Sequence, residues 1–356
     1  MLLISLFVLT LALAFAALFH WAFRHLPREH WQVLATLPLR RAADGAWHCV
    51  NLTWYGFFTA AAIVIAVALA LVMLAAIKVA PIAVVMLVIG MLVLCLPASR
   101  LIAERVEQQK GVHSVAAAML VGTLAAPWLI VLVNAAQHAL GAAPGAAIPV
   151  IPTLAAIAIA YAFGEGLGRL GCISFGCCYG CPVRDLPPAA QRLFSRFHFV
   201  FEGSLKKIAY AGNMAGERVV PVQAITAVLY VAAGLLSLYL FLLDHFATAL
   251  ILSLAVTQLW RAYSETLRAD YRGASQFTFY QMFAIASTIY GVAMLSVFRD
   301  AGDPRADLGA GLTAIWQPGA IMLCLVIFSA AFYFYGRSQV TGSNLTLYVC
   351  GHRGHV

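Results

Sequence analysis

Residues 168–180 read GRLGCISFGCCYG and combine one arginine, Arg169, with three of the eight cysteines of the chain. A guanidinium group offers a fork of donors that matches phosphate, and thiols serve as nucleophiles, metal ligands or disulfide partners. Glu165 lies four residues before Arg169, so the two side chains share one face of a helix. This spacing is consistent with a structural ion pair or with one half of an anion-binding site.

A second charged stretch, RAYSETLRADYR at residues 261–272, repeats the pattern. Arg261, Glu265 and Arg268 stand at positions i, i+4 and i+7, which is one helical face, and Arg272 follows them. Arg100 ends a further apolar stretch in the same way. Because charges beside apolar spans are costly, they usually have a partner or a function. Together these residues predict a shared site for an anion such as phosphate.

The composition of the chain indicates that membrane-spanning helices position these residues. Of the 356 residues 63% are hydrophobic and 10% are charged, and the mean hydropathy is +0.90. Too few polar side chains are present to cover a soluble globule, so we expect an all-α integral membrane protein, a polytopic helical bundle. Nine apolar stretches predict about seven core spans plus an extra span at each end: 2–23, 56–77, 80–97, 113–135, 148–168, 219–243, 247–260, 276–297 and 316–336.

The basic residues are distributed unevenly across this topology. With nine spans, all of the 22 lysines and arginines except Lys78, Arg299 and Arg305 fall on one side of the membrane. The positive-inside rule would make that face cytoplasmic, whereas a surface that gathers anionic lipid headgroups has the same composition. The two explanations are compatible, and the composition does not separate them. No nucleic-acid partner is expected.

Several motifs resemble, in order, those of the prolipoprotein diacylglyceryl transferase family. GRLGCISFGCCYG resembles the glycine–arginine signature of that family. The other stretches are TWYGFF with Tyr55, ASRLI with Arg100, VVPVQAI with Gln223, RAYSETLR with Arg261 to Arg268, and Gln281 where the family has a second glutamine. The similarity covers roughly residues 50–297. It divides the chain into an extra span and basic loop (1–50), a transferase-like core (51–300) with a small extramembrane lobe near 181–218, and an extra span and tail (301–356).

Two parts of the family pattern differ here. The family has a histidine near Ala116, which would serve as a base, and the nearest histidine in this chain is His113. The asparagine and the glutamate of the family signature are replaced by Cys172 and Cys177. The resemblance therefore predicts a divergent, transferase-like member.

The resemblance implies that the chain moves a diacylglyceryl group from an anionic phospholipid, phosphatidylglycerol, to an acceptor such as a lipoprotein cysteine, without a cofactor or metal. It implies a phosphate clamp of Arg169, Arg261 and Arg268, with Glu165, Glu265 or His113 orienting the arginines or acting as base. It also implies headgroup contacts by further residues: Tyr55, Arg100, Gln223, Arg272 and Gln281. The alternative from another class is a non-enzymatic lipid-binding or lipid-transport protein on the same fold.

The role of the cysteines stays open at this level. Cys172, Cys177, Cys178 and Cys181 lie within ten residues, so metal binding, a disulfide, an activated thiolate and simple close packing are all conceivable. Cys177 and Cys178 are adjacent, which is awkward for joint metal ligation, and the expectation is that no metal is bound.

The resemblance also bears on localisation. It implies a multi-pass protein of the bacterial inner membrane whose active face is periplasmic or outer, while positive-inside counting places the same face in the cytoplasm. We expect the outward orientation, because arginines that bind lipid phosphate are ligands and not topology signals.

Overall fold

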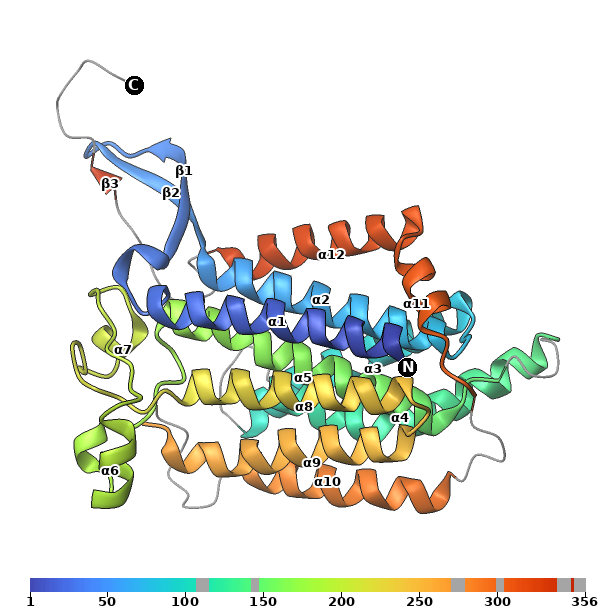
Figure 1. The fold of residues 1–356 in the computed structure, drawn as a ribbon. Helices are drawn as coiled ribbons and strands as arrows, with labels where there is room; N and C mark the ends of the chain where they lie inside the picture. Colours follow the sequence, from blue (N-terminus) through green and yellow to red (C-terminus); the bar gives the residue numbers. More distant parts are fainter. Residues whose placement is uncertain (107–114, 142–146, 270–278, 299–303, 338–346, 349–356) are drawn as a thin grey trace.

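A bundle of long helices makes up most of the chain (Figure 1). The computed structural model describes residues 1–106, 115–141, 147–269, 279–298, 304–337 and 347–348. Within these ranges the long helices are α1 (Leu2–His25), α2 (Trp54–Ala76), α3 (Pro81–Val106), α4 (Val115–Ala139), α5 (Val150–Phe175), α8 (Val222–Leu242), α9 (Phe246–Ser264), α10 (Phe279–Val297) and α12 (Pro318–Gly336).

Each of the nine predicted spans corresponds to one of these helices, which confirms the polytopic all-α fold. Seven are long and apolar enough to cross a membrane, namely α1, α2, α3, α4, α5, α8 and α12. Helix α10 contributes a shorter apolar segment, and α9, which was expected to be short, lies beside it. Helices α3 and α5 continue past their predicted ends at residues 97 and 168, so Arg100 and Arg169 lie inside helices rather than after them.

Helix α5 forms the centre of the bundle and packs against α2, α8 and α9. Two glycines let its neighbours come close. A Cβ added to Gly166 would lie 2.9 Å from Cβ of Tyr230 on α8, and one added to Gly171 would lie 2.9 Å from the carbonyl oxygen of Tyr55 on α2. Small residues allow this approach of helices in membranes, where packing replaces the hydrophobic effect. Close packing here places the ends of α2, α5, α8 and α9 around one site.

Gly166→Ala should therefore destabilise the bundle, whereas Gly168→Ala should not. The new methyl group at Gly166 would push against Tyr230 and Val231, and overpacking of this kind costs about 1–3 kcal/mol. At Gly168 the nearest side-chain atom to an added Cβ is 4.0 Å away on Ala62, an ordinary contact. Thermal unfolding followed by circular dichroism checks this pair. Equal melting temperatures for the two variants would contradict the packing argument.

A β-hairpin stands outside the bundle between α1 and α2 (Figure 1). Strand β1 (Val33–Arg41) pairs antiparallel with β2 (Ala46–Thr53), and β3 (Leu347–Tyr348) pairs with β2. Residues 1–50 were predicted to be a span and a basic loop, so these strands were not anticipated. The Asp44–Gly45 pair could have indicated them, because Asp-Gly is a common turn of β-hairpins. In the structure Gly45 has the positive φ, +86°, that such a turn needs.

A small lobe, residues 176–221, connects α5 to α8 and contains α6 (Pro188–Phe194) and α7 (Lys207–Tyr210). The hairpin, the lobe, the C-terminal ends of α1, α5 and α9 and the N-terminal ends of α2 and α8 share one end of the bundle, on the left in Figure 1. Fully buried Lys206 attaches the lobe to that end. Its Nζ donates hydrogen bonds to the carbonyl oxygens of Leu26 (2.9 Å) and Ser174 (2.6 Å).

The stability of this lobe should rise with pH. Burial lowers the pKa of Lys206 from 10.5 to about 7, although Glu29 and Glu202 oppose the shift. Between these values the unfolded chain binds a proton that the folded chain does not, so folding becomes more favourable as pH increases. Hydrogen exchange of lobe amides should show wild-type protection growing relative to Lys206→Met from pH 7 to 9. Parallel pH profiles for the two proteins would contradict this assignment.

Candidate functional site

Three arginines and two glutamates meet where α5 and α9 end. Arg169 forms an ion pair with Oε1 of Glu165, one turn earlier on α5, and Nη1 of Arg261 on α9 lies 3.7 Å from the same oxygen. Nη1 of Arg268 lies 3.5 Å from Oε1 of Glu265. The side chains of all five are at most 17% exposed, so these charges interact with little screening by water. The helical spacing of the sequence therefore does bring the two charged stretches together.

Backbone hydrogen bonds hold the two stretches in register. The amide of Cys181 donates to the carbonyl oxygen of Leu267 (2.9 Å), and the amide of Ala269 donates to that of Tyr179 (3.1 Å). These bonds join the loop after α5 to η3 (Glu265–Leu267), the turn that follows α9. Arg268 is therefore fixed beside the loop that follows Arg169, although the two are far apart in sequence.

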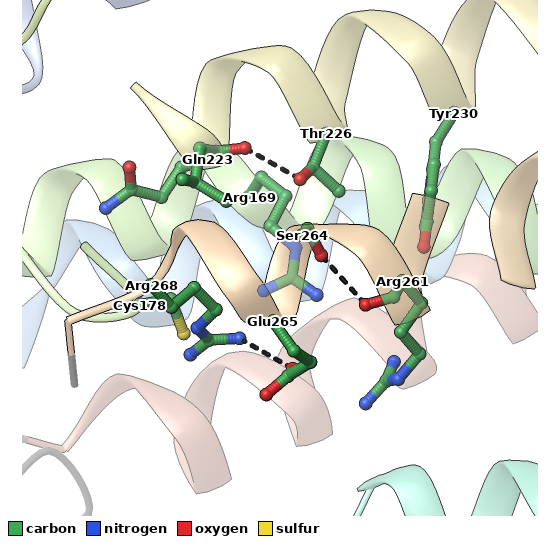
Figure 2. A pocket seen from close by; sticks show the side chains of 10 residues that line it. Arg169, Cys178, Gln223, Thr226, Tyr230, Arg261, Ser264, Glu265 and Arg268 are labelled. Carbon is green, nitrogen blue, oxygen red and sulfur yellow. Dashed lines mark hydrogen bonds and ion pairs between the residues drawn. The ribbon is translucent and has the colours of Figure 1, made fainter. Parts of the chain in front are cut away.

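The arginines line a small pocket, which we call the arginine pocket (Figure 2). Among the described residues its lining contains three arginines and one carboxylate, so the charges that face the cavity favour an anion. Its volume is about 10 Å³, room for roughly one water molecule, which is less than a phosphate group needs. The lining residues are Arg169, Cys178, Val222, Gln223, Thr226, Tyr230, Arg261, Ser264, Glu265 and Arg268.

Two buried polar atoms of residues that line this pocket make no hydrogen bond to the described residues. Nε of Arg169 and Oε1 of Gln223 are buried and have no hydrogen-bond partner among the described residues. Gln223 lies in the first turn of α8, and its Nε2 donates to the carbonyl oxygen of Cys177 (2.8 Å). Because unsatisfied buried polar groups are costly, such atoms are candidates for ligand contacts.

The remaining predicted site residues are distributed differently. Tyr55 is in the first turn of α2, its ring 5.8 Å from that of Phe175 at the end of α5. Arg100 is exposed on α3 and does not line the pocket. Gln281 is buried on α10, where its Nε2 donates to the carbonyl oxygen of Ala262 (3.0 Å) and holds α10 against α9. His113 and Arg272 lie outside the described residues.

The structure adds a tyrosine that the sequence reasoning missed. Nη1 of Arg261 donates to the hydroxyl of Tyr161 at 3.4 Å. Tyr161 also lines an apolar cavity of about 180 Å³ enclosed mainly by α4, α5, α9 and α10. It precedes Glu165 by four residues, so helical spacing could have indicated it. Tyr161 thus stands between the charged pocket and an apolar space.

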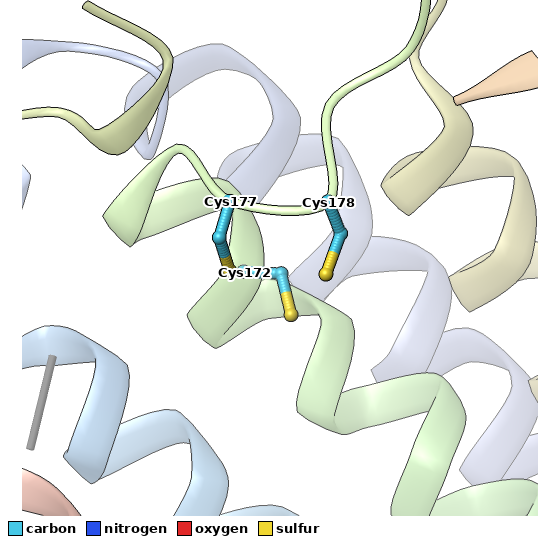
Figure 3. A group of neighbouring side chains, drawn as sticks. All are labelled: Cys172, Cys177 and Cys178. Atoms are coloured by element: carbon cyan, nitrogen blue, oxygen red, sulfur yellow. The ribbon is translucent and has the colours of Figure 1, made fainter. Parts of the chain in front are cut away.

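Three of the cysteines also gather here (Figure 3). The Sγ atoms of Cys172, Cys177 and Cys178 all lie within 4.8 Å of one another, and we call these residues the thiol cluster. Cys178 also lines the arginine pocket. Hydrogen bonds from Cys172 and Cys177 lower the pKa of Cys178 well below its usual range, and Arg268 and Arg169 add to the effect. One thiolate is therefore favoured within the cluster.

Comparison with known proteins assigns the chain to a family. The profile of one family, prolipoprotein diacylglyceryl transferase, matches residues 46–297, more than half of the chain. The chain belongs to the prolipoprotein diacylglyceryl transferase family. Membership confirms the resemblance found in the sequence and, with the apolar helices, makes the chain a multi-pass membrane transferase of lipoprotein biosynthesis. None of the curated proteins compared matches it.

The part of the chain matched by the family contains the whole charged site. Every residue of the arginine pocket and of the thiol cluster lies between residues 46 and 297, as does Tyr161. Helices α1, α11 (Leu308–Ile315) and α12 lie outside the match. Helix α12 nevertheless packs on α2, and Oγ1 of Thr53, the residue that caps the start of α2, donates to the carbonyl oxygen of Gly336 at 3.0 Å.

Proposed function

We propose that this protein transfers a diacylglyceryl group from phosphatidylglycerol to the thiol of a prolipoprotein cysteine in the bacterial inner membrane. The observation that carries the proposal is the arginine pocket, in which three arginines face one carboxylate. Guanidinium groups bind phosphate through paired, charge-assisted hydrogen bonds. Arg261 of this pocket donates to the hydroxyl of Tyr161, which lines the apolar cavity of about 180 Å³, and this proximity supports a donor with a charged head and an apolar body.

The reaction is a displacement at a glycerol carbon. The acceptor thiol loses its proton, its sulfur forms a bond to that carbon, and the bond from the carbon to the phosphate oxygen breaks. Glycerol phosphate leaves with the electron pair. Arg169, Arg261 and Arg268 are suited to stabilise the negative charge that grows on the phosphate, and their glutamate partners fix the orientation of the guanidinium groups.

Among the predicted headgroup residues, Gln223 and Tyr55 have the positions that suit this role, and the roles of Arg100, Arg272 and Gln281 stay predictions. The free Oε1 of Gln223 accepts a hydrogen bond from a donor such as a headgroup hydroxyl. Tyr55 stands at the same end of the bundle, at the start of α2. Glu165, Glu265 and His113 remain the candidates for the base that removes the thiol proton.

The test uses the purified full chain in vesicles with labelled phosphatidylglycerol and a peptide that contains a lipobox cysteine. We expect free glycerol phosphate and a thioether-linked peptide in equal amounts. The control peptide carries serine in place of the cysteine and should remain unmodified. Lipid binding without headgroup release would instead support a non-enzymatic lipid carrier. Headgroup release without peptide modification would mean that the acceptor is another molecule.

We also propose that the end of the bundle with the lobe faces the periplasm. The expectation can be checked by labelling a cysteine introduced at exposed Ser195 in the lobe, with a cysteine at exposed Gly319 on the opposite end as control. In cells whose outer membrane has been permeabilised, an impermeant thiol reagent should label the Ser195→Cys protein above the native background and leave Gly319→Cys at background. The reverse pattern would place the arginine pocket on the cytoplasmic side.

A further inference from the structure

The thiol cluster has the composition and the spacing of a metal site. Its three Sγ atoms lie within 4.8 Å of one another, at the end of α5 and in the loop that follows (Figure 3). A zinc ion bound by thiolates has Zn–S distances of about 2.3 Å in tetrahedral geometry, which sets neighbouring sulfurs about 3.8 Å apart. The side chains therefore need to move only slightly to share one ion.

The backbone removes the objection that adjacent cysteines cannot bind one ion. Helix α5 ends at Phe175 and is capped by Gly176, which has φ +71°, and the amide of Cys177 donates to the carbonyl oxygen of Cys172 at 3.1 Å. Cys178 also has a left-handed backbone, with φ +55°. A left-handed conformation is unfavourable for a residue with a side chain. Here it turns the Cys178 thiol back towards those of Cys172 and Cys177.

We propose that Cys172, Cys177 and Cys178 bind a zinc ion as three thiolates, and that the fourth position of the ion binds and activates the acceptor thiol. This inference rests on the proposed transfer to a cysteine. Among the described residues the cluster contains no fourth cysteine, histidine or carboxylate. Zinc sites with three protein ligands leave a position for substrate, whereas structural sites are closed by four.

The surrounding charges suit such a site. Zinc with three thiolates carries one net negative charge, and a fourth thiolate makes it two. Nη1 of Arg169 lies 4.0 Å from Sγ of Cys172, and Arg169 and Arg268 line the same pocket as Cys178. Arginines in these places balance the charge of the thiolates rather than repel the bound cation.

The position of the ion also suits the reaction. Cys178 lines the arginine pocket, so an acceptor sulfur held by the ion would lie beside the proposed phosphate site. The acceptor thiol releases its proton to water when it binds zinc, because a coordinating thiol is deprotonated. The resulting thiolate attacks the glycerol carbon, the carbon–oxygen bond to phosphate breaks, and the thioether product leaves the ion. Zinc keeps its oxidation state throughout.

Metal binding is tested first, on the reduced full-length protein in detergent. We expect one zinc ion per chain by elemental analysis, and cobalt substitution should produce the intense thiolate-to-cobalt absorption of a tetrahedral site. Serine variants of Cys172, Cys177 and Cys178 should each lose this absorption or reduce it several-fold. Cys181→Ser, in the same loop but outside the cluster, is the matched control and should keep it. Circular dichroism shows which variants remain folded.

A lipobox peptide then tests the open position. The cysteine peptide should shift the cobalt spectrum of the wild type, and the serine peptide should not. Equal metal uptake by wild type and the triple serine variant, or no uptake, would overturn the inference, and so would a spectrum that the cysteine peptide leaves unchanged. Transfer by a metal-free protein would show that the reaction does not need zinc, and the proposed function would stand. A peptide-sensitive metal site in a protein without transferase activity would support the zinc site and contradict the proposed transfer.

Discussion

Arg169→Lys is expected to lower the rate of glycerol phosphate release by about 100-fold while the protein stays folded. Lysine keeps the positive charge beside Glu165, but its ammonium group is a single point charge that cannot contact Glu165 and present a fork to phosphate together. Loss of one well-placed donor to a developing charge typically costs 10²–10³ in rate, or about 2.7–4 kcal/mol. Steady-state assays with phosphatidylglycerol and the lipobox peptide should show the loss mainly in kcat.

The matched control is Arg184→Lys in the lobe. Arg184 also forms an ion pair, with Oε1 of Glu217 at 3.0 Å, but its side chain is 68% exposed. Exposed pairs contribute little, so this variant should keep its turnover. Arg261→Lys, in contrast, should resemble Arg169→Lys because both guanidinium groups share Glu165. Near-normal turnover and unchanged lipid affinity in Arg169→Lys would make Arg169 a structural partner of Glu165 only.

Helical periodicity explains why much of the charged site could be predicted from the sequence. Glu165 and Arg169, like Arg261 and Glu265, stand one turn apart, so each stretch presents its charges on one face. Because each apolar span crosses the membrane once, the order of the spans determines which helix ends lie on the same side of the membrane. The structure accordingly brings Arg169, Arg261 and Arg268 to one pocket.

Contacts between distant segments could not be read in this way. Arg100 ends an apolar stretch as Arg169 does, but α3 continues past it and exposes its side chain. The contact of Gln281 Nε2 with the backbone of α9 was likewise not indicated by the sequence, and its headgroup role stays a prediction. Convergence of the three thiols depends on left-handed backbone at Gly176 and Cys178, and composition and periodicity do not encode it.

The most informative carboxylate to change is Glu165, because its Oε1 contacts both Arg169 and Arg261. Glu165→Gln keeps the shape of the side chain and removes the charge that separates two guanidinium groups. Breaking a buried ion pair from one side costs about 3–5 kcal/mol, and somewhat less here because these side chains are 13–17% exposed. We expect a melting temperature several degrees below that of the wild type in detergent without anionic lipid.

Phosphatidylglycerol should restore much of that loss, because its phosphate supplies the missing negative charge and a ligand that binds the folded state stabilises it. Diacylglycerol, which lacks the phosphate, should not. The same charge change should tighten phosphatidylglycerol binding while turnover falls, since the guanidinium groups lose the partner that orients them. Glu217→Gln in the exposed lobe pair is the control and should change none of these quantities. Equal rescue by both lipids would mean that the arginines do not meet the phosphate and that Glu165 acts only in packing.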